Sequence, residues 1–234
     1  MKFYTKVALK ILPSRILIDI YNEYKIHLLN FKINSFGNKA KRKIIEERSI
    51  KKLHIGCGNR ILKDWINTDL YNLNGVDFQL NLRKPLVFSS SYIDAIYCEH
   101  VLEHFTFEDA LQILKEFYRV LKPGAMLRIG VPDAGIYFKK YMEKDKAYFY
   151  SIRHLGGAKN ELRTPIEVIN QMFRMGGAHL YAWDFETLNL YLNDTGFVEI
   201  YRKGSGESSK EFEGCDDPSH DFETLYIECR KAKN

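Results

Sequence analysis

Short apolar segments recur between residues 50 and 131, and turn-forming residues separate them. Their lengths and boundaries predict β-strands over residues 53–56, 65–69, 76–80, 93–98 and 125–131. An amphipathic helix is predicted over residues 107–121, because its apolar side chains fall on one stripe and Pro123 and Gly124 follow it. We expect a helix after each of the better-defined strands. Strands that alternate with helices build a mostly parallel sheet covered on both faces, so the predicted fold class is α/β.

The remainder of the chain completes this sheet. Asp184 is placed to cap a helix over residues 184–193, and strands are predicted over residues 197–201 and 225–230. Two consecutive strands at the end predict an antiparallel hairpin that completes a seven-stranded sheet. Residues 133–182 lack a strand pattern and are rich in aromatic residues, so we interpret them as an inserted lid.

Residues 1–49 form a separate basic segment ahead of one domain over residues 50–234. Apolar residues recur there at helical spacing on both sides of Pro13, which predicts a helical N-terminal extension. Residues 1–52 hold thirteen Lys or Arg against four Asp or Glu, whereas the whole chain has a net charge of +5. Residues 1–50 could contact an acidic membrane surface or a partner enzyme such as a glycosyltransferase, although a solvated helix face is the commoner reason for a charge run.

The chain has no apolar run long enough to cross a membrane and no signal-peptide pattern at its start. We therefore expect a cytoplasmic protein, with association to a membrane surface as the alternative. The four cysteines have no CxxC spacing, so we expect reduced thiols rather than a zinc knuckle or a redox pair.

Residues 52–59, Lys-Leu-His-Ile-Gly-Cys-Gly-Asn, indicate a strand that runs into a Gly-x-Gly turn and then a helix start. Glycine permits a tight turn and a close approach of the backbone to a ligand at the helix N-terminus. A dinucleotide site would require a third glycine where this chain has Ile61, and an acidic residue about 20 positions further on. Asp69 instead ends the next strand, where its carboxylate can accept both hydroxyls of a ribose. The combination suits an adenosine ligand without a pyrophosphate.

Three further segments carry a resemblance to a known family. They are residues 76–82, residues 91–104 (Ser-Tyr-Ile-Asp-Ala-Ile-Tyr-Cys-Glu-His-Val-Leu-Glu-His), and residues 119–133, with Lys-Pro-Gly before a strand. With the glycine turn they resemble class I methyltransferases that use S-adenosyl-L-methionine (SAM), most of all the type 11 group. Residues 179–188, His-Leu-Tyr-Ala-Trp-Asp-Phe-Glu-Thr-Leu, resemble methyltransferases of bacterial surface-polysaccharide gene clusters. The resemblance covers roughly residues 50–230 and implies a Rossmann-like fold, SAM as cofactor and methyl transfer.

The resemblance implies cofactor contacts for seven residues, namely Gly56, Cys57, Gly58, Asp69, Asn81, Leu82 and Glu99. The glycine turn would line the methionine end and the ribose, and Asp69 would bind the ribose hydroxyls. Asn81 and Leu82 would face the adenine, and Glu99 would form the floor of the pocket. Two positions depart from the family pattern, because His54 and Asn81 stand where acidic residues are usual. Asn81 can still hydrogen-bond an adenine amino group, whereas His54 weakens the expected contact with the methionine amine.

Methyl transfer from a sulfonium is an in-line displacement, so positioning the acceptor supplies much of the catalysis and a strong base is optional. For an alcohol acceptor a general base would help, and the candidates are His104, His100 and Asp133, all predicted at the carboxyl ends of strands. Each of them could instead cap a helix or orient a loop. The insertion adds arginines and tyrosines, which suit phosphate and sugar groups but also occur in ordinary packing.

His100, Glu103 and His104 also spell the His-x-x-Glu-His pattern of zinc peptidases, with two histidines one helical turn apart. That hypothesis leaves the glycine turn and the position of Asp69 unexplained. A zinc hydrolase is therefore a remote alternative, and no metal is expected.

The predicted function is O-methylation of a sugar hydroxyl in a surface-polysaccharide precursor or a similar small molecule, with SAM as the donor. A small-molecule N-methyltransferase and a SAM-binding subunit without activity are the alternatives. Nucleic acid is not expected as a partner, because the basic residues cluster outside the catalytic half and no RNA-binding motif is present.

Overall fold

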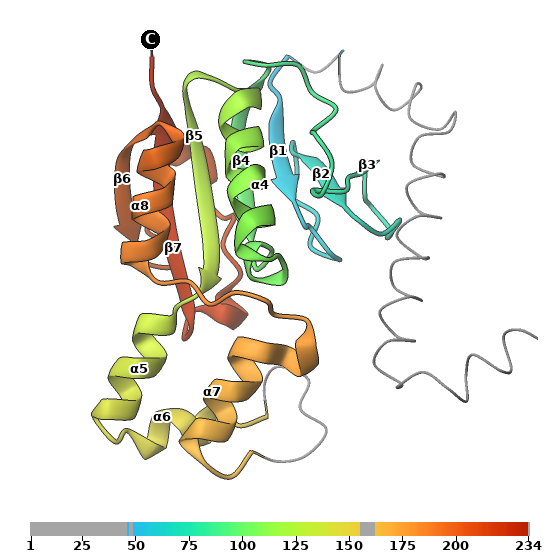
Figure 1. Ribbon diagram of the computed structural model, residues 1–234. Coiled ribbons are helices and arrows are strands. Elements are labelled where there is room, and N and C mark those ends of the chain that lie inside the picture. The colour runs from blue at the N-terminus through green and yellow to red at the C-terminus, as the bar shows by residue number, and fades with distance from the viewer. Residues whose placement is uncertain (1–45, 47–48, 155–161, 234) are drawn as a thin grey trace, which may run out of the picture. The chain divides into compact units, whose positions relative to one another are not determined.

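The computed structural model of the protein describes residues 46, 49–154 and 162–233. Its centre is a sheet with the strand order β3-β2-β1-β4-β5-β7-β6 (Figure 1). The strands are β1 (Lys52–Ile55), β2 (Ile66–Asp69), β3 (Phe78–Gln79), β4 (Ile93–Glu99), β5 (Leu121–Pro132), β6 (Phe197–Lys203) and β7 (Thr224–Lys231). β1 to β5 pair in parallel, and β7 is antiparallel to both β5 and β6. The predicted seven-stranded, mostly parallel sheet with an antiparallel C-terminal pair is confirmed.

The central strands are apolar because both faces of the sheet are covered. Leu53 and Ile55 of β1 are at most 1% exposed, and Leu53 lies opposite Ile66 of β2 and Ile96 of β4. The strand order changes direction at β1, since β2 and β3 lie on one side of it and β4 and β5 on the other. In open α/β sheets such a point leaves a crevice outside the carboxyl ends of the strands, where ligands bind.

Two amphipathic helices, α4 (Phe107–Val120) and α8 (Phe185–Thr195), cover one face of the sheet (Figure 1). Thr106 caps α4 and Asp184 caps α8, each through a side-chain oxygen that accepts a backbone N–H. Both predicted helices and the Asp184 cap are confirmed. β5 begins at Leu121, earlier than predicted, because Leu121 already pairs with Ile93 of β4.

Within the described residues, the opposite face of the central strands is covered by a long loop, residues 204–223, instead of helices. This segment contains two short 3-10 helices, η3 (Lys210–Phe212) and η4 (Pro218–His220). A cluster of buried side chains fills the space between the loop and the sheet: Trp65, Ala95, Tyr97, Met126, Phe212 and Cys215. The loop therefore does the packing that a helical layer does elsewhere in α/β folds.

The predicted helix after the glycine turn is wrong, because residues 56–65 form turns. Asn67 holds these turns together. Its Oδ1 accepts the N–H of Leu62 at 2.9 Å, and its Nδ2 donates to the carbonyls of Leu62 at 2.9 Å and Trp65 at 3.2 Å. Trp65 packs in the cluster between the sheet and the 204–223 loop and is 5% exposed. The connection is thus stabilised by one side chain and by burial, without helical hydrogen bonds. No helix separates β2 from β3 or β3 from β4 either.

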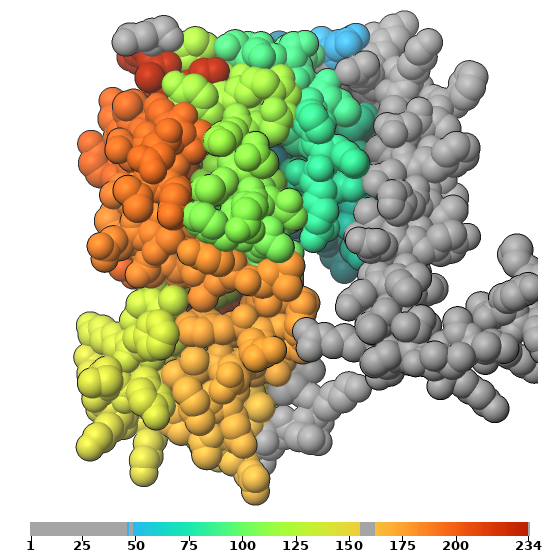
Figure 2. Space-filling view, in the orientation of Figure 1, coloured from blue at the N-terminus to red at the C-terminus, as the bar shows by residue number. Residues whose placement is uncertain are grey.

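The insertion contains α5 (Ala134–Met142), α6 (Lys146–Ser151), α7 (Pro165–Arg174) and the 3-10 helix η2 (Met175–Gly177). Its helices gather beyond the carboxyl end of β5 as a distinct lobe (Figure 1, Figure 2). They share a small core: Tyr137, Phe149, Ile152, Val168, Ile169 and Met172. Tyr137 and Phe149 therefore serve packing, the alternative that the sequence left open, whereas Phe138, Tyr141 and Tyr150 are exposed.

The predicted extension over residues 1–49, with its membrane or partner contact, lies outside the described residues except for positions 46 and 49. In the part of the chain that the structure describes, no helix has the length and apolar character of a membrane span. All four cysteines are buried and unpaired, in agreement with the prediction of free thiols.

Candidate functional site

A cavity of about 490 Å³ opens at the carboxyl ends of β1 and β2. This volume lies in the range of small-molecule sites. Its lining comes from the ends of β1 and β2, the segments after β2 and β3, and residues that follow β4: Ile55, Gly56, Gly58, Thr68, Asp69, Leu70, Tyr71, Leu73, Leu80, Asn81, Leu82, Arg83, His100, Val101, His104 and Phe105. Five of the seven predicted cofactor residues are in this lining, and Cys57 and Glu99 are not.

The glycine turn forms one wall of this cavity. Gly56 and Gly58 have φ angles of 68° and 51°, in the left-handed region that favours glycine. A Cβ atom on Gly56 would lie 2.2 Å from Cγ2 of Val101, whereas one on Gly58 would meet nothing within 4 Å. Between them Cys57 is buried, and its N–H donates to the carbonyl of Thr68 at 3.0 Å. Burial, aided by the charge of Asp69, raises the pKa of the Cys57 thiol to about 11.

Asp69 ends β2, and its carboxylate faces the glycine turn. Oδ2 accepts the N–H of Gly58 at 3.0 Å, and Oδ1 accepts the N–H of Tyr71 at 2.9 Å. These bonds hold the carboxylate at the cavity wall, and an ionised carboxylate oxygen has a second lone-pair site for a hydroxyl donor. The arrangement suits the predicted contact with ribose hydroxyls, which stays a prediction.

Asn81 and Leu82 follow β3 and also line the cavity. Oδ1 of Asn81 accepts the N–H of Arg83 at 3.0 Å, which orients the amide group. The Arg83 guanidinium lies 4.8 Å from the centre of the Phe105 ring. Apolar Leu80 and Phe105 beside the amide provide the surroundings that a planar base requires.

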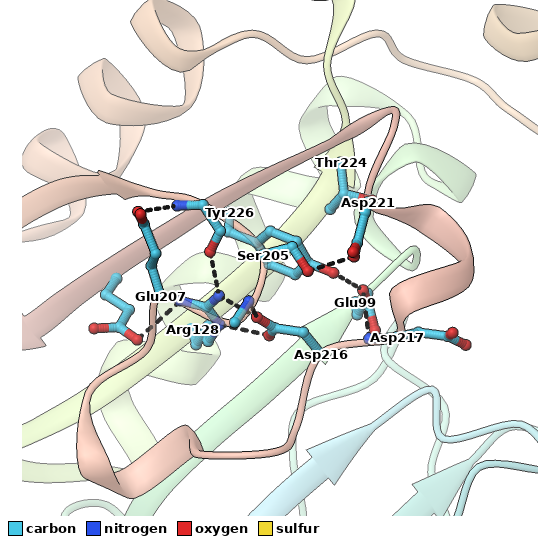
Figure 3. Close-up of polar contacts among 12 residues, drawn as sticks. Glu99, Arg128, Ser205, Glu207, Asp216, Asp217, Asp221, Thr224 and Tyr226 are labelled. Atoms are coloured by element: carbon cyan, nitrogen blue, oxygen red, sulfur yellow. Dashed lines mark hydrogen bonds and ion pairs between the residues drawn. The ribbon is translucent and has the colours of Figure 1, made fainter.

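The Glu99 carboxylate does not line the cavity and lies instead at the sheet face that the 204–223 loop covers (Figure 3). It accepts hydrogen bonds from the hydroxyls of Tyr97, at 2.7 Å, and Tyr226, and it pairs with Arg60 at 3.3 Å. Side chains two positions apart on a strand share a face, so Glu99 follows Tyr97. The predicted cofactor contact of Glu99 is therefore not retained.

His54 is buried on the same face and does not line the cavity. Its Nδ1 lies 3.0 Å from Oδ1 of Asn67, and its ring centre lies 5.3 Å from that of Tyr97. Burial lowers the pKa of His54 to about 4, so the ring is neutral. His54, where the resemblance would imply an acidic residue, therefore contributes no charge to the cavity.

A second cavity, of about 170 Å³, adjoins residues of the insertion. It is lined by His100, Glu103, His104, Pro132, Met172, Met175, His179, His220, Phe222 and Glu223. His100 and His104 line both cavities. Two of the three predicted base candidates thus lie where the cavities meet.

Polar neighbours orient both of these histidines. Nε2 of His100 lies 2.8 Å from Oγ1 of Thr224, and Nδ1 of His104 lies 3.1 Å from the carbonyl oxygen of Ala178. Burial by itself would lower the pKa of His100, but the adjacent Glu103 carboxylate outweighs it and the pKa is raised overall.

The third base candidate, Asp133, lines neither cavity. It is 1% exposed, its Oδ1 accepts the N–H of Gly135 at 2.9 Å as the cap of α5, and its Oδ2 pairs with Arg202. Both carboxylate oxygens are therefore committed to structural contacts. Asp133 is therefore a helix cap, which is the alternative that the sequence left open, and we no longer consider it a general base.

The His-x-x-Glu-His segment does not form the helix of a zinc peptidase. Only η1 (Leu102–His104), a 3-10 helix, is present, and His100 precedes it with a φ of 50°. His100 and His104 also fall in separate groups of possible metal ligands, one with Glu99 and His220 and one with Glu103 and His179. Two histidines on one helical face, which the peptidase hypothesis requires, are absent here.

Sequence reasoning missed residues in both cavities. Tyr71, Arg83 and Phe105 follow predicted strands closely, so their position after a strand end was the signal that could have found them. His220 and Glu223 come from the loop before β7, far along the chain from His100. No local pattern connects these positions, and only the fold brings them together.

Alanine at position 56 should lower the melting temperature by about 5 °C or more, because an overpacked contact costs typically 1–3 kcal/mol. The added Cβ would collide with Val101. Alanine at position 58 is the matched control, since it imposes the same positive φ without a collision. Thermal unfolding followed by circular dichroism compares the two variants, and equal losses would contradict the close approach at Gly56.

Comparison with known families gives one match. Residues 53–129 match the type 11 family model described as "Methyltransferase domain", and every residue that lines the larger cavity lies within this range. The match agrees with the predicted enzyme class, a methyltransferase, for which SAM is the predicted methyl donor. The comparison with curated proteins gave no match.

Several solved structures are similar to this chain at low identity. The CurJ carbon methyltransferase is 15% identical, with a TM-score of 0.48, over 83% of this chain and 51% of that chain. A SAM-dependent methyltransferase from Archaeoglobus fulgidus is 14% identical, with a TM-score of 0.48, over 88% of this chain and 99% of that chain. One from Methanosarcina mazei is 16% identical, with a TM-score of 0.47, over 82% and 97%. This chain spans about half the length of the CurJ chain.

Proposed function

We propose that this protein transfers the methyl group of SAM to a hydroxyl group of a sugar, in a surface-polysaccharide precursor or a similar small molecule. The observation that carries the proposal is that two cavities meet at His100 and His104. The larger lies within the methyltransferase domain match, and the smaller adjoins the insertion. Donor and acceptor in adjoining cavities can be held in line, which supplies much of the rate of a displacement reaction.

The residues of the larger cavity fit SAM. The turn at Gly56 and Gly58 presents bare backbone to the methionine end, and a side chain at position 56 could not be accommodated. Asp69 would accept the ribose hydroxyls, and Asn81 with Leu82 would contact the adenine. When bound there, SAM supplies an electrophilic methyl group on a sulfonium.

The insertion supports an acceptor that carries a phosphate group. Met172 and Met175 line the second cavity, while Arg163 and Arg174 line a surface hollow of about 620 Å³ on the same segment. Arginine guanidinium groups bind phosphate through paired hydrogen bonds. A sugar linked to a nucleotide or a lipid phosphate is therefore the acceptor class that we propose.

The acceptor hydroxyl must lose its proton as the oxygen–methyl bond forms. His100 and His104 lie at the junction of the cavities and are the side chains placed to receive it. The proposal does not depend on which of them acts, because alignment carries the larger part of the catalysis.

The test is to incubate the purified full chain with methyl-labelled SAM and a panel of nucleotide-linked and lipid-linked sugars. We expect label in a sugar, with formation of S-adenosylhomocysteine only when an acceptor is present. Calorimetry on the same protein should show binding of SAM and none of a nicotinamide dinucleotide. Label in an amine would favour an N-methyltransferase, and SAM binding without transfer to any acceptor would favour a subunit without activity. Absence of SAM binding would overturn the proposal.

A further inference from the structure

Three potential metal ligands meet in the second cavity. A carboxylate oxygen of Glu103 and one ring nitrogen each of His104 and His179 lie within 4.8 Å of one another. Glu103 and His104 belong to η1, which follows β4, whereas His179 follows the last helical turn of the insertion. The backbone already joins the two parts, because the carbonyl of Glu103 accepts the N–H of Leu180 at 2.7 Å. The cluster is therefore held together independently of any ligand.

Glu103 is a buried carboxylate that lacks hydrogen bonds. It is 2% exposed, and neither of its carboxylate oxygens has a hydrogen-bond partner in the described part of the chain. Nδ1 of His100 is 3.4 Å from Oε1, which is the distance of an ion pair, whereas Oε2 has no hydrogen-bond partner among the described residues. A buried carboxylate is costly unless a cation or several donors compensate it. Oε2 of Glu103 is thus left without a partner at the point where two imidazoles converge.

Both imidazoles are oriented as metal ligands commonly are. Nδ1 of His104 lies 3.1 Å from the carbonyl oxygen of Ala178, and Nδ1 of His179 is hydrogen-bonded to the carbonyl oxygen of Met172. A carbonyl oxygen only accepts, so Nδ1 is the donor in each ring and Nε2 is the nitrogen that is left for a metal. A backbone carbonyl that fixes the tautomer in this way is the usual outer partner of a metal-binding histidine.

The neighbouring group of Glu99, His100 and His220 does not share these features. The Glu99 carboxylate already accepts hydrogen bonds from Tyr97 and Tyr226 and pairs with Arg60. All three members of that group are only partly buried. Of the two groups, the one that contains Glu103 is therefore the one with a carboxylate oxygen that lacks a partner.

We propose that Glu103, His104 and His179 bind a divalent transition-metal ion of the zinc class. Two imidazoles and a carboxylate are a donor set that zinc accepts, and three protein ligands leave a further position open to water or to an acceptor oxygen in the cavity. Metal–ligand bonds of about 2.0–2.2 Å require the three side chains to draw closer together, which rotation about their side-chain bonds can supply. The ion would compensate Glu103 and join η1 to the insertion.

This inference goes beyond the proposed function and does not depend on it, since metal binding requires neither SAM nor an acceptor. It replaces the sequence-based expectation of no metal. It also assigns His104 to the ion, which leaves His100 as the other histidine at the junction of the cavities.

The test is a titration of the chelator-treated full chain with Co²⁺, followed by displacement with Zn²⁺. We expect about one ion per chain and the visible absorption of a Co²⁺ site of low coordination number. X-ray absorption of the zinc-loaded protein should show imidazole and oxygen ligands and no sulfur. Glu103→Gln and His179→Gln should each weaken binding by at least about tenfold. His154→Gln is the matched control, because His154 is exposed and outside the cluster, and it should leave the affinity unchanged.

Sulfur ligands, or no ion retained by the unmodified chain, would overturn the proposal whatever the variants do. Affinity that survives Glu103→Gln and His179→Gln but is lost in His220→Gln would also overturn it, because the ion would then belong to the neighbouring group. The X-ray absorption measurement needs no substitution, so it remains decisive if a variant fails to fold. Loss of metal binding leaves the methyl-transfer assay unaffected as a separate test of the proposed function.

Discussion

Replacing Asp69 with alanine should weaken the binding of SAM more than tenfold, measured by calorimetry. The two oxygens of Asp69 accept the N–H groups of Gly58 and Tyr71 at the cavity wall. We expect the remaining lone pairs to accept the ribose hydroxyls. A hydrogen bond to a charged group contributes about 1.5–3 kcal/mol, and tenfold in affinity corresponds to about 1.4 kcal/mol. The substitution also releases the N–H of Gly58, so the turn loses support on the same side.

Two comparisons make this prediction specific. Asp69→Asn keeps one carbonyl oxygen and should lose less affinity than Asp69→Ala. Asp194→Ala removes an exposed aspartate on α8, outside the cavity lining, and should bind SAM as the unmodified chain does. Unchanged affinity in a folded Asp69→Ala protein would place the ribose elsewhere.

Replacing Arg128 with methionine should lower the free energy of unfolding by about 3–5 kcal/mol, because it leaves buried carboxylates without a counter-charge. Arg128 lies on β5 and is fully buried. Its Nε donates to Oδ1 of Asp216 at 2.8 Å and its Nη1 to Oε1 of Glu228 at 2.9 Å, while Nη2 reaches the carbonyl of Gly204 at 3.2 Å (Figure 3). These contacts fasten the 204–223 loop to the sheet. Urea denaturation measures the loss.

The mechanism of this loss can be separated from simple loss of packing. If unpaired charge is the cause, adding Asp216→Asn and Glu228→Gln to Arg128→Met should restore part of the stability. Lys122→Gln breaks the partly exposed pair with Asp94, whose atoms lie 2.6 Å apart, and should cost less than about 1 kcal/mol. A loss at Arg128 no larger than that at Lys122 would contradict the structural importance of the network.

The sheet and its two covering helices follow from local pattern. β4 and α4 were predictable because each buries one continuous set of apolar side chains, with period and length characteristic of a strand or a helix. The connection after β1 was not predictable, since a glycine turn that precedes a ligand site usually leads into a helix. Here Asn67 hydrogen-bonds the connection and Trp65 is buried beneath the sheet, and both effects depend on residues outside the turn.

The larger of the two cavities was also largely predictable, because carboxyl ends of neighbouring parallel strands converge in space. This places Gly56, Gly58, Asp69 and Asn81 around one volume. Glu99 and Asp133 were also predicted at strand ends beside the ligands, but neither lines this cavity. Glu99 is the last residue of β4, and Asp133 directly follows β5. The contacts of each depend on the side of the strand on which its side chain lies: Glu99 contacts Tyr226, and Asp133 pairs with Arg202.

Residue types and their spacing thus predicted the fold class, the two covering helices and much of the lining of the larger cavity, because each depends on neighbours within a few tens of residues. The second cavity depends on contacts between distant segments. His104, His179 and His220 come from a segment after β4, the insertion and the last loop. They line one cavity only once the sheet has formed and the insertion has packed against it, since a one-dimensional pattern holds no information on which distant side chains share a buried space.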